Sequence, residues 1–380
     1  MVVQMRDEIG AGRETSAVVE GRRGTGVEGG VSEKEPSSGL ARQAVKLERQ
    51  PGMIDVARLA GVSYQTVSRV VNDLPDVRPS TRVKVLAAVE QLGYRRNLGA
   101  RALKTRQPTT FGIVSDGSPR FGPLRTLLAL ESAAREAGYG STVVIVKEPH
   151  AGTVPAAIRG LEESGVGGII VITPRIGFAT VVRETRVRVP VVMIAAGEAG
   201  RPGIFAYSED QERGARIATR HLLDLGHTEI VHLAGSMDWF DGRVRRRGWE
   251  AEMREADLEP SRCFEGDWTP GWAYQMGLRL FTEGIPGAIF AASDHMALGL
   301  FRAFAENGVR VPADVSVVGF DDIEGADYFY PPLTTIRQDF TALARRSIDL
   351  LLRAVEGRDT DLTPLAEVLV IRDSTAPPTR

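Results

Sequence analysis

The first periodic run of hydrophobic residues begins at Ile54 and has the three- and four-residue spacing of a helix. The run ends at Gly61, a residue that suits a helix C-cap. A helix is therefore expected over residues 54–60. Its apolar stripe consists of Ile54, Val56, Ala57, Leu59 and Ala60.

A second helix is expected after a three-residue turn, because Ser63 is a good N-cap and valines follow at helical spacing. These valines are Val67, Val70 and Val71. The other face of this helix carries polar side chains that can bond base edges or phosphates in a DNA major groove, namely Tyr64, Gln65, Ser68 and Arg69. Two short helices joined by a tight glycine turn predict a helix-turn-helix whose second helix reads DNA.

A third helix is expected from Pro79 to Leu92, with proline in its first turn and Gly93 as its stop. Its expected inward positions are Val83, Leu86, Ala87 and Val89 to Leu92. The next segment, YRRNLGARALKTRQP, predicts a short basic helix that Asn97 caps and that ends near Thr105. A helix this short is marginal in water, so it should become ordered only against DNA or a second copy of the chain.

From about Pro108 onward, short apolar runs alternate with helical stretches. The runs TFGIVS, STVVIVK, GGIIVI, PVVMIA, EIVHLAG, AIFAA and VSVVGF have the Val and Ile content of buried parallel strands. Helical patterns lie between them in GPLRTLLALESAAREAGY, SEDQERGARIATRHLLDLGH, GRVRRRGWEAEMREA, GWAYQMGLRLFTEG and DHMALGLFRAFAENGV. The alternation predicts a doubly wound α/β fold with two parallel sheets, and a ligand cleft beyond the carboxyl ends of their strands.

Residues 1–52 show no period of 2 or 3.6, contain no aromatic residue and are rich in Gly, Glu, Arg and Ser. Such a segment cannot bury enough apolar surface to offset the entropy of ordering, so a disordered extension is expected. Because Met53 directly precedes the first periodic segment, the alternative is that part of this extension is a start-site artefact.

The composition is that of a globular protein with two or three domains. The chain has 380 residues, of which 43% are hydrophobic and 25% charged, and it contains no apolar run of eighteen residues. Its single cysteine, Cys263, cannot form an internal disulfide, and no apolar signal-like segment opens the chain. We therefore expect a reducing, cytoplasmic location and no membrane span.

The distribution of charge favours nucleic-acid binding. Ten basic and four acidic residues lie between Met53 and Gln107, a net charge of +6 in a chain whose overall net charge is -2. Such a segment is typical of a nucleic-acid-binding module. A solvated helical face is the alternative interpretation.

The segment from Ile54 to Arg106 resembles the N-terminal part of the lactose-repressor (galactose and ribose repressor) family of bacterial transcription factors, most specifically in GVSYQTVSRVVN. The resemblance implies base reading by Tyr64, Gln65 and Arg69, and a hinge helix over residues 97–105. It also implies that Leu103 wedges into the minor groove and kinks the operator. The expected DNA-binding residues are Ser63, Tyr64, Gln65, Ser68, Arg69, Asn72, Asn97, Ala100 and Leu103.

The resemblance continues to the end of the chain and implies the two-lobed fold of periplasmic sugar-binding proteins, with three chain crossovers. The expected domains are a helix-turn-helix over residues 53–96, a hinge helix and linker over 97–107, and an effector-binding and dimerisation domain over 108–374. In that last domain, the N-lobe takes residues 108–208 and 340–367, and the C-lobe takes 209–338.

The resemblance also implies a set of sugar-binding positions in the cleft. Arg245 would bond hydroxyls through its fixed donors, and Trp268 would stack on the apolar face of the sugar. The whole set is Asp116, Arg245, Trp268, Ser293, Asp321 and Gln338. Each residue alone also has a structural interpretation. Arg245 could lie on a solvated helix face, Trp268 could be a core aromatic residue, and Asp321 could cap a helix.

The identity of the sugar follows less directly. The segments EGDW, MALG and PPLTTIRQDF keep the pattern of the lactose-repressor branch, which favours a galactoside or related hexoside. Ile172 and Ala195 replace polar contact residues of that branch, which instead allows a different sugar.

Enzymatic interpretations find little support. Ser293, Asp294 and His295 are consecutive and cannot converge as a triad, and no G-x-S-x-G elbow or phosphate loop is present. The histidines lack the spacing of metal ligands. We therefore expect neither catalysis nor a cofactor or metal ion. The remaining rival is a stand-alone sugar-binding protein, which would not carry a basic helix-turn-helix.

The combined expectation is a homodimeric repressor that binds a pseudo-palindromic double-stranded DNA operator and responds to a small sugar. A tetramer is not expected, because no leucine heptads follow VLVIRDSTAPPTR. The expected dimer face involves the helix FGPLRTLLALESAAREAG, which is unusually rich in leucine at Leu124, Leu127, Leu128 and Leu130. A plain core helix is the alternative.

Overall fold

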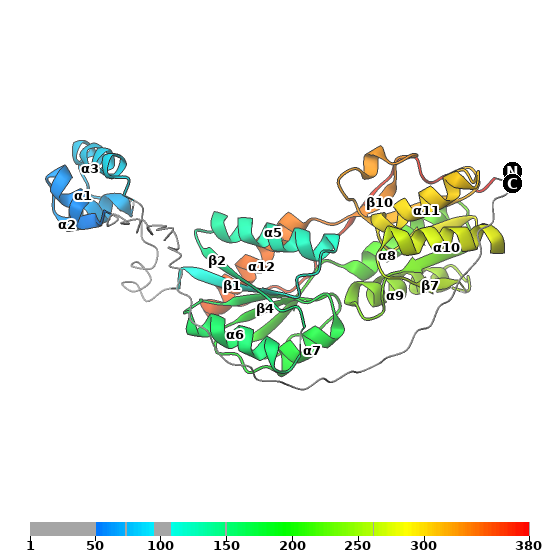
Figure 1. Ribbon diagram of the computed structural model, residues 1–380, viewed down its shortest axis with the longest axis horizontal. Helices are drawn as coiled ribbons and strands as arrows, with labels where there is room; N and C mark the ends of the chain where they lie inside the picture. Colours follow the sequence, from blue (N-terminus) through cyan, green and yellow to red (C-terminus); the bar gives the residue numbers. More distant parts are fainter. Residues whose placement is uncertain (1–50, 73, 95–107, 149, 261, 380) are drawn as a thin grey trace, which may run out of the picture. The chain divides into compact units, whose positions relative to one another are not determined.

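The computed structural model describes residues 51–72, 74–94, 108–148, 150–260 and 262–379. They belong to two compact units, a head within residues 1–95 and a core within residues 96–380 (Figure 1). The expected extension up to residue 50 and the expected hinge helix, including Asn97, Ala100 and Leu103, lie outside the described residues.

The described residues of the head form three helices: α1 (Met53–Ala60), α2 (Tyr64–Val71) and α3 (Pro79–Leu92). All three were predicted from the sequence. Gly61 and Gly93 end α1 and α3 in the left-handed conformation, with φ of 64° and 60°. Ser63 caps α2, since its hydroxyl accepts a hydrogen bond from the backbone N–H of Thr66 at 3.2 Å.

The interior of the head is small and differs from the predicted one. Its buried side chains are Val56, Val67, Val70, Val85 and Ala88. The predicted inward positions Ile54 and Leu59 in α1 and Val83, Leu86 and Ala87 in α3 are exposed, so these predictions were wrong. Each residue advances about 100° around a helix, and turning Val85 and Ala88 inward therefore turns Val83 and Leu86 outward.

The N-lobe of the core is built on a five-stranded parallel sheet in the order β2-β1-β3-β4-β5. Its strands are β1 (Thr110–Ser115), β2 (Gly140–Ile145), β3 (Ile169–Ile172), β4 (Val191–Ile194) and β5 (Ile204–Tyr207). The sequence predicted all but β5. It also predicted burial for β2, which was wrong: β2 lies at the sheet edge, and Val143 and Ile145 are more than 40% exposed.

Helices cover both faces of this sheet (Figure 1). They are α5 (Phe121–Glu136), α6 (Thr153–Glu163), α7 (Ile176–Glu184) and α12 (Phe340–Val355). Ile113 and Ile170 pack with Leu130 of α5 and Leu351 of α12, whereas Val114 and its neighbours pack with α6 and α7. Successive strand residues point to opposite faces, which explains the two separate hydrophobic clusters.

The C-lobe contains a six-stranded sheet in the order β11-β10-β9-β8-β6-β7, parallel except for β11. Its strands are β6 (Ile230–Ala234), β7 (Cys263–Glu265), β8 (Ala288–Ala291), β9 (Ser316–Asp321), β10 (Thr334–Arg337) and β11 (Val368–Val370). Its helices are α8 (Gln211–Asp224), α9 (Phe240–Glu255), α10 (Pro270–Glu283) and α11 (Asp294–Glu306), with a 3-10 turn, η1 (Ala326–Tyr328). The expected α/β class with two parallel sheets is confirmed.

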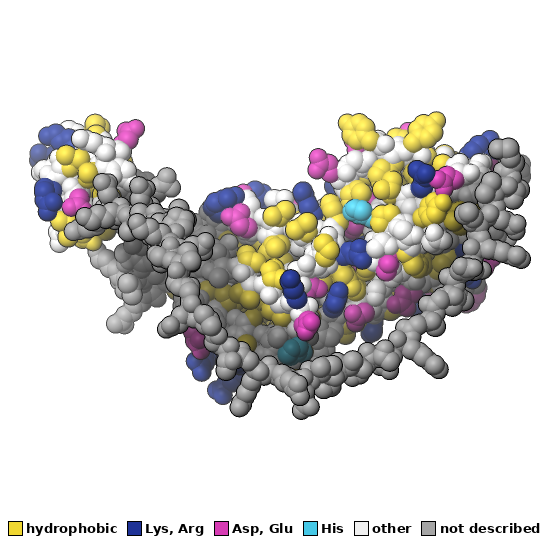
Figure 2. All heavy atoms as spheres, in the orientation of Figure 1, with side chains coloured by type: hydrophobic (Ala, Val, Ile, Leu, Met, Phe, Trp, Pro, Cys, Tyr) yellow, Lys and Arg dark blue, Asp and Glu magenta, His cyan; other side chains and the backbone are white. Residues whose placement is uncertain are grey.

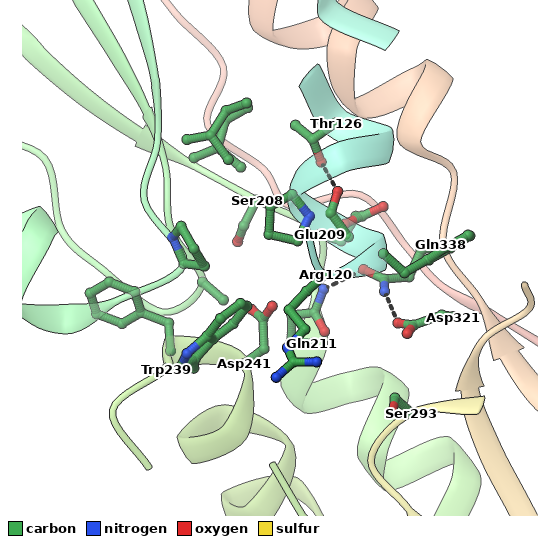
Figure 3. Close-up of a pocket in the computed structure, with 18 of the residues that line it drawn as sticks. Arg120, Thr126, Ser208, Glu209, Gln211, Trp239, Asp241, Ser293, Asp321 and Gln338 are labelled. Carbon is green, nitrogen blue, oxygen red and sulfur yellow. Dashed lines mark hydrogen bonds between the residues drawn. The ribbon is translucent and has the colours of Figure 1, made fainter. Parts of the chain in front are cut away.

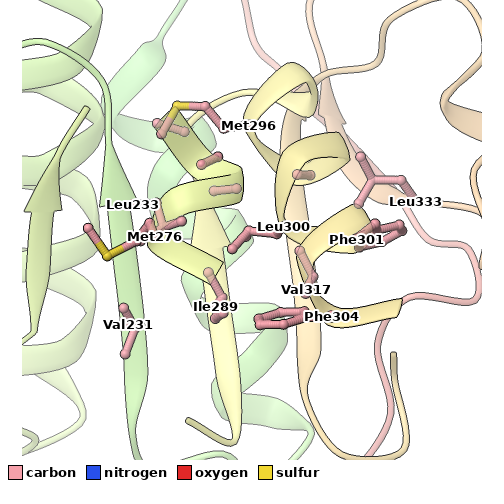
Figure 4. Close-up of a cluster of buried hydrophobic side chains, with 14 of the residues drawn as sticks. Val231, Leu233, Met276, Ile289, Met296, Leu300, Phe301, Phe304, Val317 and Leu333 are labelled. Atoms are coloured by element: carbon pink, nitrogen blue, oxygen red, sulfur yellow. The ribbon is translucent and has the colours of Figure 1, made fainter. Parts of the chain in front are cut away.

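Figure 4 shows the hydrophobic cluster between this sheet and helices α10 and α11. Ile289 and Val317 of the strands face Leu300 and Phe304 of α11. On the opposite face, Trp249 of α9 packs with Phe290 and Phe320. Both faces are thus apolar, as expected for a mainly parallel sheet.

The chain passes three times between the lobes: between β5 and α8, between β10 and α12, and between α12 and β11. The carboxyl ends of the parallel strands are where ligands bind in open α/β sheets. Within the described ranges, no helix combines the length and apolar character needed to cross a bilayer.

Candidate functional site

The outer surface of α2 is the candidate nucleic-acid interface. Tyr64, Gln65 and Arg69 are exposed, with Tyr64 at 42%, while Val67 and Val70 of the same helix are buried. Figure 2 shows basic side chains on the head. The arrangement presents aromatic, amide and guanidinium groups together, the types that contact base edges in a major groove.

The other predicted contact residues of the head have structural roles in α2. The Ser63 hydroxyl caps the helix. The Asn72 side chain folds back, and its Nδ2 donates to the Ser68 carbonyl at 2.6 Å and to the Ser68 hydroxyl at 3.2 Å. These bonds fix the two ends of the helix and so hold its exposed face in place.

A cavity of about 230 Å³ lies between the lobes of the core (Figure 3). Arg245, Trp268, Ser293, Asp321 and Gln338, five of the six predicted ligand-binding residues, line it. Pockets for drug-sized ligands have volumes of roughly 300–1,000 Å³, so this cavity suits a smaller molecule. Beside it the lobes touch, since the Ile176 N–H donates to the Asp238 carbonyl at 3.0 Å.

Four polar side chains of the cavity form a closed ring of hydrogen bonds. Arg245 Nε donates to Gln211 Oε1 at 2.8 Å, and Gln211 Nε2 donates to Gln338 Oε1 at 2.7 Å. Gln338 Nε2 and Arg245 Nη2 then both donate to Asp321 Oδ1. The ring joins α8, α9, β9 and the segment after β10, and it fixes the directions in which a ligand meets donors and acceptors.

Burial controls the charges in this ring. The Arg245 guanidinium is 3% exposed and lies 3.6 Å from the centroid of the Phe320 ring. Burial raises the pKa of Asp321 to about 6, against the opposing field of Arg245. Arg245 also donates to the Ala292 carbonyl, so its donors are largely committed within the protein.

Trp268 is held in an unusual backbone conformation, with φ of 69°. Its ring lies so close to Gly235 that a Cβ there would come within 2.0 Å of it. The ring centroids of Trp239 and Trp268 are 5.6 Å apart. In the described part of the chain, the buried indole Nε1 of Trp268 has no hydrogen-bond partner. Strained or unsatisfied groups of this kind concentrate at ligand sites.

Ser293 and Asp116 were both predicted to contact the ligand, but each also makes a hydrogen bond within the protein. Ser293 lines the cavity, yet its hydroxyl caps α11 by accepting from the Met296 N–H at 3.3 Å. Asp116 does not line the cavity. Its carboxylate instead accepts from the Ser118 N–H at 2.9 Å and lies 3.6 Å from Arg175 Nε, so it is engaged in the turn after β1.

Sequence reasoning missed several residues of the cavity wall: Arg120, Phe121, Glu209, Gln211, Trp239, Asp241 and Phe340. All lie in loops after strands or in the first turn of a helix. Polar residues just after the strands of a parallel sheet can be predicted to line a ligand site. For the residues that follow β5 and β10, this prediction requires that both segments are first recognised as strands. Both strands have only four residues, and β5, which leads into α8, was not predicted, so Gln211 at the start of α8 was missed.

The structure gives no support to catalytic or metal chemistry. The Asp294 carboxylate accepts from Thr335 Oγ1 at 2.6 Å and from the Ile323 N–H at 2.8 Å, so it is engaged with these two groups and does not orient His295. His232 is fully buried and stacks on Trp249 and Phe290. In the part of the chain that is described, no group of His, Cys, Asp and Glu is arranged to hold a metal ion.

Two family profiles match the chain, one on each unit. Residues 52–97 match bacterial regulatory proteins of the lacI family, and residues 219–375 match a periplasmic binding protein-like domain. The Lactose operon repressor of Escherichia coli is 36% identical over 325 residues, covering 85% of this chain and 90% of that protein. The HTH-type transcriptional repressor PurR of Haemophilus influenzae is 33% identical, covering 84% and 97%.

Solved structures agree with these sequence matches. A lac repressor dimer bound to operator and the anti-inducer ONPF has a TM-score of 0.73 at 34% identity, covering 86% of this chain and 100% of that one. A complex of the transcriptional regulator CelR with cellobiose has a TM-score of 0.61 at 29% identity, covering 85% and 99%. The curated relatives are repressors and not enzymes, which confirms the expectation of a non-catalytic protein.

Proposed function

The chain belongs to the lacI family of bacterial regulatory proteins and is a transcriptional repressor with a DNA-binding head, and we propose that a small sugar bound in the cleft controls its operator affinity. The expected family membership is confirmed, and the rival interpretation as a stand-alone sugar-binding protein is excluded by the head. We place this function in the cytoplasm, where bacterial DNA lies.

We assign operator reading to the exposed face of α2. Gln65 is suited to adenine and Arg69 to guanine, because each can form two hydrogen bonds to that base in the major groove. Tyr64 offers a ring that can pack on a thymine methyl group. Two such heads related by a two-fold axis would read a pseudo-palindromic operator.

The hydrogen-bond ring of Arg245, Gln211, Gln338 and Asp321 is the observation that carries the sugar proposal. It places an acidic acceptor and amide groups beside the indole of Trp268, and sugars combine hydroxyl groups with an apolar face. A related structure is named as a cellobiose complex, and another as the lac repressor bound to ONPG. A galactoside or related hexoside remains our first choice of ligand.

Calorimetric titration of the full chain with galactose, methyl β-galactoside, cellobiose and adenine tests this ligand class. One of the three sugars is expected to bind, and Gln338→Ala should weaken it by about tenfold or more because two links of the ring are lost. The control is Gln275→Ala on the exposed side of α10. Binding of adenine and of none of the sugars would show that the cleft binds flat heterocycles, and it would refute the proposal of a sugar ligand.

A homodimer completes the proposal. Leu124 and Leu128 of α5 are 44% and 57% exposed, whereas Leu127 is partly buried and Leu130 is fully buried in the lobe. Only two of the four leucines are therefore available for a partner, and the other two belong to the core. One related structure is named as a dimer. Light scattering of the purified chain should give a two-chain mass, and a four-chain mass would refute the dimer.

A further inference from the structure

Two carboxyl groups on the cavity wall lie outside the hydrogen-bond ring. Glu209, in the crossover between β5 and α8, is 5% exposed and lines the cavity, and its Oε1 has no hydrogen-bond partner among the residues that the structure describes. Asp241, in the first turn of α9, lines the same cavity. Figure 3 shows both among the side chains that surround the cavity.

No cation within the described ranges forms an ion pair with either carboxyl group. Arg245 is near enough for its charge to act on both, but its donors are directed to Gln211, Asp321 and the Ala292 carbonyl. Additional acidic groups act on Glu209, namely Asp321 and Asp339. This part of the cavity is therefore acidic and rich in acceptors.

An unpartnered buried carboxyl group is costly to the folded protein. Burial, together with the charge of Asp241, raises the pKa of Glu209 to about 8, and burial raises the pKa of Asp241 as well. Glu209 can accept a hydrogen bond whether or not it carries its proton. A ligand that brings a donor to Glu209 Oε1 would satisfy this atom, whereas an anionic ligand would add a like charge beside Asp241.

The following assignment rests on the proposed function. We propose that Glu209 and Asp241 form an acceptor subsite of the cleft, which binds hydrogen-bond donors of a neutral or cationic sugar and rejects anionic sugars. The chemical class of the effector is thereby narrowed to sugars that carry hydroxyl or amino groups without a carboxylate or phosphate.

Calorimetric titration of the full chain with galactose, galactosamine and galacturonate tests the subsite. These sugars share one ring and differ at a single position each, where galactosamine carries an amino group at C2 and galacturonate a carboxylate at C6. Galacturonate is expected to bind at least tenfold more weakly than galactose and galactosamine. Asp241→Asn should narrow the gap between galacturonate and galactose about tenfold. Glu209→Gln should weaken galactose and galactosamine by similar factors near neutral pH, because Glu209 is largely protonated there and the amide brings two N–H donors to a position that accepts hydrogen bonds from the ligand. The matched control is Glu212→Gln, because this side chain is 44% exposed and faces Arg247 on the surface.

The outcomes separate this inference from the function on which it rests. Galacturonate that binds as tightly as galactose would overturn the acceptor subsite while keeping the sugar cleft. Equal weakening of all three sugars in both variants would also overturn it, because it would show a general loss of structure. The absence of binding by any sugar, neutral ones included, would refute the sugar cleft itself.

Discussion

At the scale of single residues, several carboxyl groups in the cleft are desolvated by burial. These carboxyl groups include Asp321 and Glu209. Glu367, which is buried outside the cavity wall, also has its pKa raised well above the ordinary range, with desolvation as the main cause. Among the described residues, neither Glu367 carboxyl oxygen has a hydrogen-bond partner. The effector domain therefore holds protons that the unfolded chain would release near pH 4–5.

A pH-dependent stability follows for Glu209. Its pKa is about 8 in the folded chain against an ordinary value of 4.5, so the folded state binds this proton more tightly. Stability should fall as pH rises from about 4.5 to 8, by at most about 5 kcal/mol for this group. Glu209→Gln removes this pH-dependent loss of stability. The melting temperature of the variant minus that of the native protein should therefore be several degrees higher at pH 9 than at pH 6.

Thermal unfolding at the two pH values checks this prediction. The charges of Asp241, Arg245, Asp321 and Asp339 act on Glu209 and are present in both proteins. Glu209 itself acts on Tyr207 and Glu367, so the difference between the two proteins measures Glu209 together with its effect on these two groups. The surface variant Glu212→Gln serves as control. Melting curves of Glu209→Gln that keep the same offset from the native protein at both pH values would contradict the raised pKa.

At the scale of elements, length alone did not decide what could be predicted from the sequence. The four-residue strands β3, β4 and β8 were predicted, whereas the sixteen-residue helix α12 was missed. All five helices predicted in the core formed, including α5, α9 and α11. Strands β7 and β11 have three residues each, and α6 contains Pro155 and Gly160, which weaken any helical pattern. In α3 the helix was predictable but not its inward face, because apolar residues occur around the whole circumference.

The face of α3 gives a direct mutational test. Val85 is fully buried and Val83 is 66% exposed in the same helix. Val85→Ala should destabilise the head by about 2 kcal/mol through lost packing, while Val83→Ala should change stability by less than about 0.5 kcal/mol. Hydrogen exchange of the head amides in the full chain measures both effects. If Val83→Ala destabilised the head more than Val85→Ala, the face of α3 that the sequence predicted to be buried would be the correct one.

The expected hinge helix can be tested through Leu103, which lies outside the described residues. If Leu103 kinks the operator as the family resemblance implies, Leu103→Ala should weaken operator binding by tenfold or more and leave sugar affinity unchanged. Operator and sugar titrations on the same preparation check the two affinities. Equal loss of both would mean that the substitution had damaged the fold.

At the scale of the whole molecule, the cleft combines residues that are distant in sequence, such as Gln211 and Gln338. Resemblance to a family placed Arg245, Trp268, Ser293, Asp321 and Gln338 at one cavity, where the structure brings them together. It could not predict that the Asp116 carboxylate is engaged in a turn, or that Glu209 lacks a partner. Those facts depend on how two lobes and three crossovers pack, which one sequence does not reveal.

The two units are coupled only if sugar and operator affect each other's binding. If a sugar binds better to the form that does not bind DNA, it must lower operator affinity by the same factor by which operator lowers sugar affinity. Couplings of this kind are typically about 1–3 kcal/mol, equivalent to about 5- to 150-fold in affinity.

Fluorescence polarisation of a labelled palindrome resembling the lactose operator tests this coupling most directly, at two salt concentrations and with and without a galactoside. We predict binding that weakens at higher salt, prefers the palindrome over random DNA, and falls by at least fivefold when the galactoside is added. Operator binding that is the same with every sugar found to bind the cleft would contradict a sugar-controlled repressor.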